Sequence, residues 1–177
     1  MKKTTLSLTA LGLLLGWSPA LVAQSCAAAN SCQVTTTASV TVPALVSLDV
    51  SGGGALSLTP PGANDLTTGY VEDAGPTFTL KANRAWTLSV HTTNATDFTY
   101  TGTQGGVKPI SDMTWSTTSG GTYAAITGTA ASVTTGTKTN GASPSLFFRT
   151  LYSADFSDDR NAAGSYSMDL VFTVSAP

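Results

Sequence analysis

The chain has 177 residues, of which 41% are hydrophobic and only 10% are charged, and its formal net charge is −2. This length is sufficient for one domain with a full hydrophobic core. The few basic residues form no basic stripe, which argues against nucleic acid and anionic membrane surfaces as partners.

The first 23 residues have the pattern of a secretory signal peptide. Lys2 and Lys3 precede a leucine-rich apolar run that reaches Trp17, and small residues follow it. The run is shorter than the roughly 18–20 residues that a membrane-spanning helix needs. We expect cleavage after Ala23, with Ala20 as the alternative, and no membrane insertion afterwards. The protein is therefore expected to be secreted, at the cell surface or in the periplasm.

Residues 24–33 are expected to form a loosely ordered N-terminal arm that contains both cysteines. In an exported protein, Cys26 and Cys32 are expected to close a short disulfide loop. So short a loop stabilises a fold less than a long one. The alternative is a lipoprotein acylated on Cys26, which Gln24 fits poorly because a small residue is wanted there.

From residue 34 onward the pattern is that of short strands separated by Gly and Pro turns. The expected strands span 34–42, 45–50, 55–58, 78–82, 85–90, 98–100, 110–115, 123–126 and 146–152, with a weak strand at 130–133. Residues 62–76 and 134–143 are expected to be loops. Asn83 and Arg84 indicate either a tight hairpin or a bulge in one long strand. Ser119-Gly120-Gly121 indicates a second hairpin, and 146–152 is the most hydrophobic run and the expected central strand.

The last fourteen residues alternate between large apolar and small polar side chains. A strand places alternate residues on opposite faces, so one face of this segment is expected to be buried. That core face comprises Tyr166, Met168, Leu170, Phe172 and Val174. A strand cannot bury such a face alone, so we expect an all-β, single-domain antiparallel sandwich of two sheets over residues 34–177. It would have about 8–10 strands and be immunoglobulin-like or jelly-roll-like.

No catalytic set is recognisable in the sequence. There is one histidine, His91, and there is neither a Gly-x-Ser-x-Gly elbow nor a His-rich metal spacing. We therefore expect no enzymatic activity. The acidic turn near residue 155 offers four oxygen-bearing side chains within seven residues, which is the ligand chemistry that Ca²⁺ prefers. These candidate calcium ligands are Asp155, Asp158, Asp159 and Asn161; the alternative is a solvated turn that keeps a sheet edge soluble.

Three aromatic residues are candidates for a sugar-stacking surface. Trp115, Tyr100 and Tyr123 do not lie on an obviously buried alternation face. Exposed rings in line on a sheet would stack on a polysaccharide, whereas single surface aromatics are common and carry no such meaning.

The C-terminal strand resembles the end of WxL-type bacterial surface domains. Tyr166 and Leu170 hold the spacing of that family, while Phe172 and Val174 stand where Trp and Leu are expected. Trp86-Thr87-Leu88 resembles the family's other Trp-x-Leu element. The resemblance implies attachment to the cell wall or assembly with other surface proteins.

The same tail is similar to fimbrial and spore-coat-U-like subunits. Those carry a glycine fourteen residues from the end, which is Gly164 here, followed by an alternating final strand. Both resemblances imply a bacterial surface β-sandwich with a structural role.

These observations together lead to one functional expectation and one alternative. We expect a secreted, non-catalytic protein of the cell envelope with a structural or adhesive role, either associated with a surface layer or fimbria-like. Its partners would be other envelope proteins or copies of itself, and the 34–42 strand would be donated to a neighbour in the fimbria-like version. The alternative is a module that binds an envelope or extracellular polysaccharide.

Overall fold

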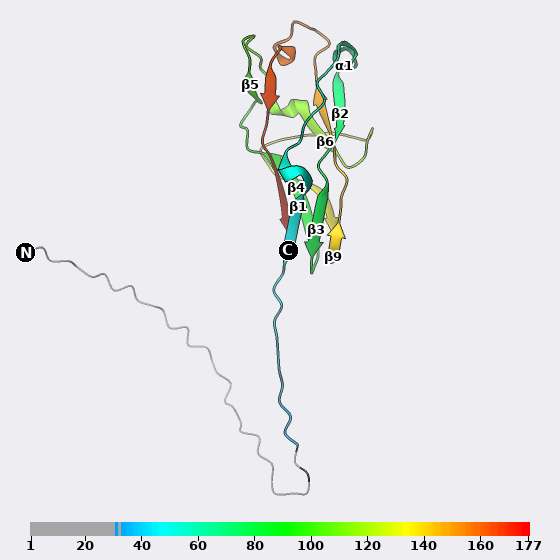
Figure 1. Ribbon diagram of the computed structural model, residues 1–177, viewed down its shortest axis with the longest axis vertical. Helices are drawn as coiled ribbons and strands as arrows, with labels where there is room; N and C mark the ends of the chain where they lie inside the picture. Colours follow the sequence, from blue (N-terminus) through cyan, green and yellow to red (C-terminus); the bar gives the residue numbers. More distant parts are fainter. Residues whose placement is uncertain (1–30, 32) are drawn as a thin grey trace, which may run out of the picture. The chain divides into compact units, whose positions relative to one another are not determined.

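Antiparallel β-strands are the main regular structure of the computed structural model, which describes residues 31 and 33–177 (Figure 1). The expected signal peptide, the disulfide and the lipidation site at Cys26 lie outside the described residues. The strands are β1 (Val46–Val50), β2 (Tyr70–Ala74), β3 (Phe78–Ala82), β4 (Trp86–Thr92), β5 (Thr99–Thr101), β6 (Met113–Ser116), β7 (Ala124–Ala125), β8 (Ala131–Gly136), β9 (Thr139–Ala142), β10 (Phe147–Leu151), β11 (Ser165–Ser167) and β12 (Leu170–Ser175). The helices are α1 (Ala63–Thr68) and the 3₁₀ turns η1 (Ser51–Gly54), η2 (Ile110–Asp112) and η3 (Asp159–Asn161).

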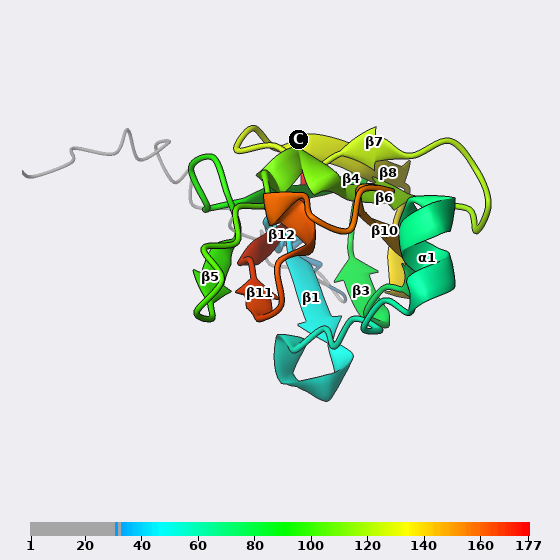
Figure 2. The same ribbon diagram turned by 90° about the horizontal axis from the view of Figure 1, so that it is seen from above.

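The strands form two packed layers, as expected for an all-β, sandwich-like fold. One layer contains the sheet β1-β3-β9, and the facing layer contains β12-β4-β8. Figure 2 shows β1 and β3 on one side and β4 and β8 on the other. Two further sheets, β2-β10-β6-β7 and β11-β5, extend the layers along the strand direction. All eight strand pairings in the described residues are antiparallel.

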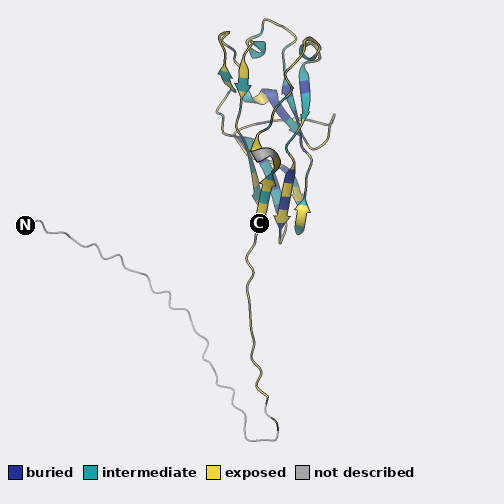
Figure 3. Ribbon diagram, in the orientation of Figure 1, coloured by how far each residue is buried: buried dark blue, intermediate teal, exposed yellow. Residues whose placement is uncertain are grey.

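The core lies between these layers and takes alternate side chains from each. Phe78 and Leu80 of β3 and Leu88 of β4 are fully buried. Across the core, the rings of Phe78 and Phe172 meet edge to face with centroids 5.0 Å apart. The apolar face of the C-terminal segment is half-buried and packs against this cluster. The alternation of residues along β3 and β4 in the sequence therefore matches the alternation of more and less buried side chains (Figure 3).

The expected turn at Asn83 and Arg84 is neither a hairpin nor a bulge. It carries the chain from one layer to the other, because β3 pairs with β1 and β9 whereas β4 pairs with β12 and β8. The alternation pattern is the same on both sides of the crossing, so the sequence could not distinguish two layers from one ribbon.

The C-terminal segment forms two strands where the sequence predicted one. β11 pairs with β5 and β12 pairs with β4, and the break falls at Met168 and Asp169. There the Asn94 side-chain oxygen accepts from the Asp169 N–H at 3.0 Å, and the Thr92 hydroxyl donates to the Asp169 carbonyl at 2.7 Å. Side-chain hydrogen bonds thus replace the ladder at this point.

Two expected loops contain regular structure. Residues 62–76 hold α1 and β2, and residues 134–143 hold the end of β8 and all of β9. Helix α1 begins where the Asp65 carboxylate accepts from the Gly62 N–H at 2.8 Å, and it ends at Gly69, whose φ is 89°. Local caps therefore define a helix too short for its apolar period to be recognised.

Candidate functional site

Residues 34–42, which we call the arm, have the sequence of a strand but no sheet. The strand expected there is absent, since the described residues from 33 to 45 form neither helix nor strand. The even positions from Val34 to Val42 carry apolar side chains or Thr36, whereas the odd positions are all Thr or Ser. Val40 is 89% exposed and Val42 is 68% exposed. Such an alternating face is stable only when another sheet covers it.

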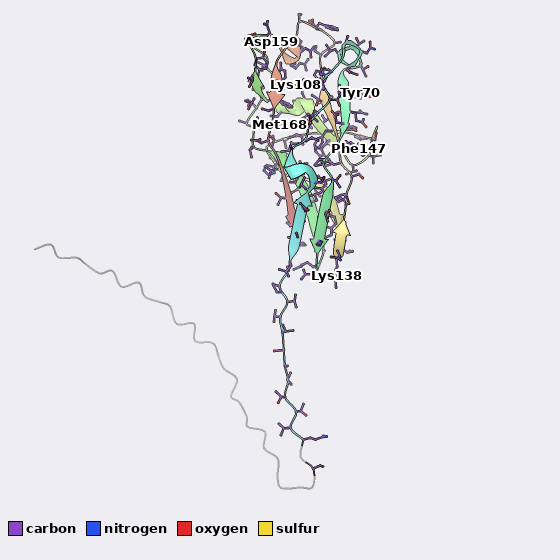
Figure 4. The ribbon with its side chains drawn as sticks, in the orientation of Figure 1. Tyr70, Lys108, Lys138, Phe147, Asp159 and Met168 are labelled. Carbon is purple, nitrogen blue, oxygen red and sulfur yellow. The ribbon has the colours of Figure 1, made fainter. Side chains whose placement is uncertain are left out.

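An apolar groove of about 760 Å³ opens between the two layers, next to η1. One wall is the segment Ala55–Leu58, and the other is β12 together with the residues before it, including Met168, which Figure 4 labels. Buried Phe98 and Met113 also line the groove. Its apolar wall residues are half-buried side chains that the sandwich covers on one side only: Leu56, Leu58, Met168, Leu170 and Phe172.

Both walls of the groove present unpaired backbone. Among the described residues, β12 is the edge of its sheet and pairs only with β4, so alternate N–H and C=O groups face away from that partner. Ala55–Leu58 belongs to no strand of the described structure, although Leu56 and Leu58 are half-buried and Ala55 and Ser57 are exposed. This is strand-like alternation without a ladder. The groove is therefore a gap between two strand edges that one further strand would fill.

The four candidate calcium ligands lie in one turn, where other groups occupy most of their oxygen atoms. Asp158 pairs with Arg160 at 3.0 Å, and Asp155 accepts from the residue two positions later. Asn161 donates its amide to two backbone carbonyls, and Asp159 begins η3 (Figure 4). The described part of the chain holds no group of three or more His, Cys, Asp or Glu side chains that could bind a metal. The turn is held by its own hydrogen bonds.

The three candidate sugar-binding aromatics lie on different elements and make different contacts. Tyr100 of β5 packs on Tyr166 with centroids 5.0 Å apart, and its hydroxyl donates to the carbonyl of Ala163 at 2.8 Å. Trp115 of β6 is half-buried against the core. Tyr123, before β7, lies 4.0 Å from the guanidinium of an arginine. Sugar binding by these three residues stays a prediction.

That arginine, Arg149, is at the centre of a cluster that the sequence did not reveal. Its guanidinium lies between the rings of Tyr70 and Tyr123, at 4.2 and 4.0 Å, and pairs with Glu72 at 2.9 Å. Glu72 also accepts from the Ser119 hydroxyl at 2.6 Å, and these hydrogen bonds lower its pKa to about 2. The cluster fastens the β6–β7 loop over β2 and β10. The sequence indicated this cluster only through a single arginine in the most hydrophobic run of the chain.

A second cluster missed in the sequence surrounds Lys108, whose side chain is 1% exposed. Its ammonium donates to the carbonyl of Leu151, lies 3.5 Å from Asp112 and stands 4.2 Å above the ring of Tyr152 (Figure 4). Burial lowers the pKa of Lys108 and raises the pKa of Tyr152 to about 12. No local pattern distinguishes this lysine from an exposed loop lysine.

Comparison with known proteins does not assign a function to these features. No protein-family model matches the chain, and no curated protein is found to be similar to it. Within residues 31 and 33–177, no helix combines the length and apolar character needed to cross a membrane. A functional proposal therefore rests on the arm and the groove.

Proposed function

We propose that the protein is a secreted, non-catalytic component of the cell envelope with a structural role, whose copies assemble by strand addition. The arm of one copy would occupy the apolar groove of another. One observation carries the proposal: the described residues include a segment with the alternation of a strand but no sheet and, elsewhere, a sheet edge without a neighbouring strand. The similarity of the C-terminal segment to fimbrial subunits is consistent with such a role.

The chemistry of the arm matches that of the groove. Val34, Val40 and Val42 would turn toward the half-buried leucines and methionine of the groove, and the Thr and Ser residues would face solvent. Burying each valine contributes about 1.5–3 kcal/mol. The nine residues of the arm extend roughly 30 Å at about 3.3 Å per residue, which is the length of a long strand.

Backbone pairing adds to this apolar contact. A strand inserted between Ala55–Leu58 and β12 would give hydrogen-bond partners to both edges at once. Main-chain bonds supply affinity in strand addition, and the alternate side chains fix the register. A one-residue slip would bring Thr and Ser into the groove, so a single register is favoured.

The proposal is tested by placing one charge on each face of the arm. The change Val40→Asp puts a carboxylate on the apolar face and is expected to reduce self-assembly of the processed chain at least tenfold. The matched control Thr41→Asp adds the same charge to the other face and is expected to leave assembly within about twofold of wild type. Light scattering coupled to size exclusion measures both. A wild-type chain that stays monomeric at every concentration would contradict the proposal.

A further inference from the structure

We infer that Asn83 reserves the groove for the arm of a second copy, because it holds the chain's own arm at its root. This inference rests on the function proposed above and names the partner at that site. The root is Pro43–Leu45, the three residues between the arm and β1. Asn83 lies where the chain crosses between the layers, directly after β3.

Three hydrogen bonds join Asn83 to the root. The Leu45 N–H donates to Asn83 Oδ1 at 2.9 Å, and Asn83 Nδ2 donates to the Pro43 carbonyl at 2.8 Å. The backbone N–H of Asn83 donates to the Leu45 carbonyl at 3.2 Å. The amide thus binds both a donor and an acceptor of the root, which fixes the course of the backbone from Pro43 into β1.

The held root and the groove lie at opposite ends of β1. The groove is lined by Val50 and Gly54, at and beyond the C-terminal end of β1, and not by Val46. The root precedes Val46, one strand length away, which is roughly 16 Å for five residues at about 3.3 Å each. For its own arm to enter the groove, the chain would have to reverse direction at Pro43–Leu45.

The chain cannot reverse direction at the root while the Asn83 hydrogen bonds are intact. A turn at Pro43–Leu45 would move the Pro43 carbonyl and the Leu45 N–H away from the Asn83 amide, and all three bonds depend on their present course. An arm that enters a neighbouring copy needs no such turn. The arm is long enough for either outcome, so Asn83 decides between a closed monomer and an assembly.

The test compares Asn83→Ala with Asn64→Ala, an exposed asparagine of α1 that contacts neither arm nor groove. Losing two side-chain hydrogen bonds is expected to shift the equilibrium on the order of tenfold toward closed monomers. Sedimentation velocity on the processed chain measures that ratio, and protease digestion of the monomer fraction shows whether the arm is protected. Asn83→Asp keeps the acceptor but loses the donor to Pro43, and should give an intermediate shift.

A labelled peptide of residues 33–45 separates failure of this inference from failure of the proposed function. At concentrations too low for assembly, we expect the peptide to bind the wild-type and Asn64→Ala chains and to bind Asn83→Ala more weakly, because the groove of that variant is already filled by its own arm. If the peptide binds wild type and the Asn83→Ala ratio is unchanged, the role of Asn83 is wrong and strand addition stands. If the peptide does not bind wild type at all, both are wrong.

Discussion

Lys108 shows how one buried charge can hold together loops that are distant in the sequence. Its ammonium reaches the carbonyls of Leu151 and Arg160 and the carboxylate of Asp112, so three segments meet at one side chain. A buried ion pair contributes little net stability compared with an apolar pair of the same shape. Removing one partner is costly, however, because the other charge then stays buried without compensation.

We therefore expect Lys108→Ala to lower the free energy of unfolding by about 3–5 kcal/mol. The variant leaves the buried Asp112 carboxylate with only Arg160, 3.9 Å away, as a charged partner, and it removes one donor from each of two backbone carbonyls. Lys81→Ala is the matched control, since Lys81 is exposed on β3, and it should change stability by no more than about 0.5 kcal/mol. Urea unfolding followed by tryptophan fluorescence measures both, and equal losses would contradict this account.

At the scale of elements, Gly75 is the point where two sheets become one continuous layer. It lies between β2 and β3, and its N–H donates to the carbonyl of Leu146 at 2.7 Å, between β9 and β10. Four strands are thereby joined end to end as two long ones. A Cβ at Gly75 would stand 2.8 Å from that carbonyl oxygen, so only glycine allows this approach.

Gly75→Ala is accordingly expected to cost about 1–3 kcal/mol of stability, through strain or loss of the Leu146 hydrogen bond. Gly128→Ala provides the control, because a Cβ there would meet its nearest neighbour only at 4.0 Å. That control should be neutral or slightly stabilising, since alanine reduces the conformational freedom of the unfolded chain. Thermal unfolding of both variants gives the comparison, and a Gly75→Ala protein as stable as Gly128→Ala would show that the two sheets are not joined here.

Elements that are marked by a local residue pattern could be predicted from the sequence. The β6–β7 hairpin forms around Gly120, whose φ is 67°, and β10 is central because it pairs with both β2 and β6. The hydrophobic run at 146–152 marked the central strand, and the glycines marked the hairpin turn.

Elements that depend on distant partners could not be predicted in this way. At the crossing and at the break, a side chain bonds to backbone that is distant in the sequence: Asn83 accepts from the Leu45 N–H, and Asn94 accepts from the Asp169 N–H. The alternation of the flanking residues is unaffected by either event. A single sequence contains the residues but not the contact that gives them this role.

At the scale of the whole molecule, the same dependence on distant partners explains why the sequence indicated the arm but not the groove. The alternation of residues 34–42 predicted a strand, which the structure does not contain, and the donation of this segment to a neighbour stays a prediction. The groove was not recognisable, because it depends on β12 being an edge and on Ala55–Leu58 remaining unpaired. Strand-like alternation indicates that a sheet must cover the apolar face. It does not indicate whether that sheet belongs to the same chain or to another copy.

The proposed assembly by strand addition would make the stability of the whole molecule depend on its concentration. In such an assembly a neighbour's arm would bind the folded state and not the unfolded one, so each tenfold rise in concentration should add roughly 1.4 kcal/mol once the groove is mostly filled. We expect the melting temperature of the wild-type chain to rise by several degrees over two decades of concentration. The Val40→Asp chain cannot fill the groove and should melt at one temperature throughout. Scanning calorimetry of both chains at matched concentrations measures these melting temperatures. A wild-type melting temperature independent of concentration would mean that the arm does not contribute to the fold of its neighbour.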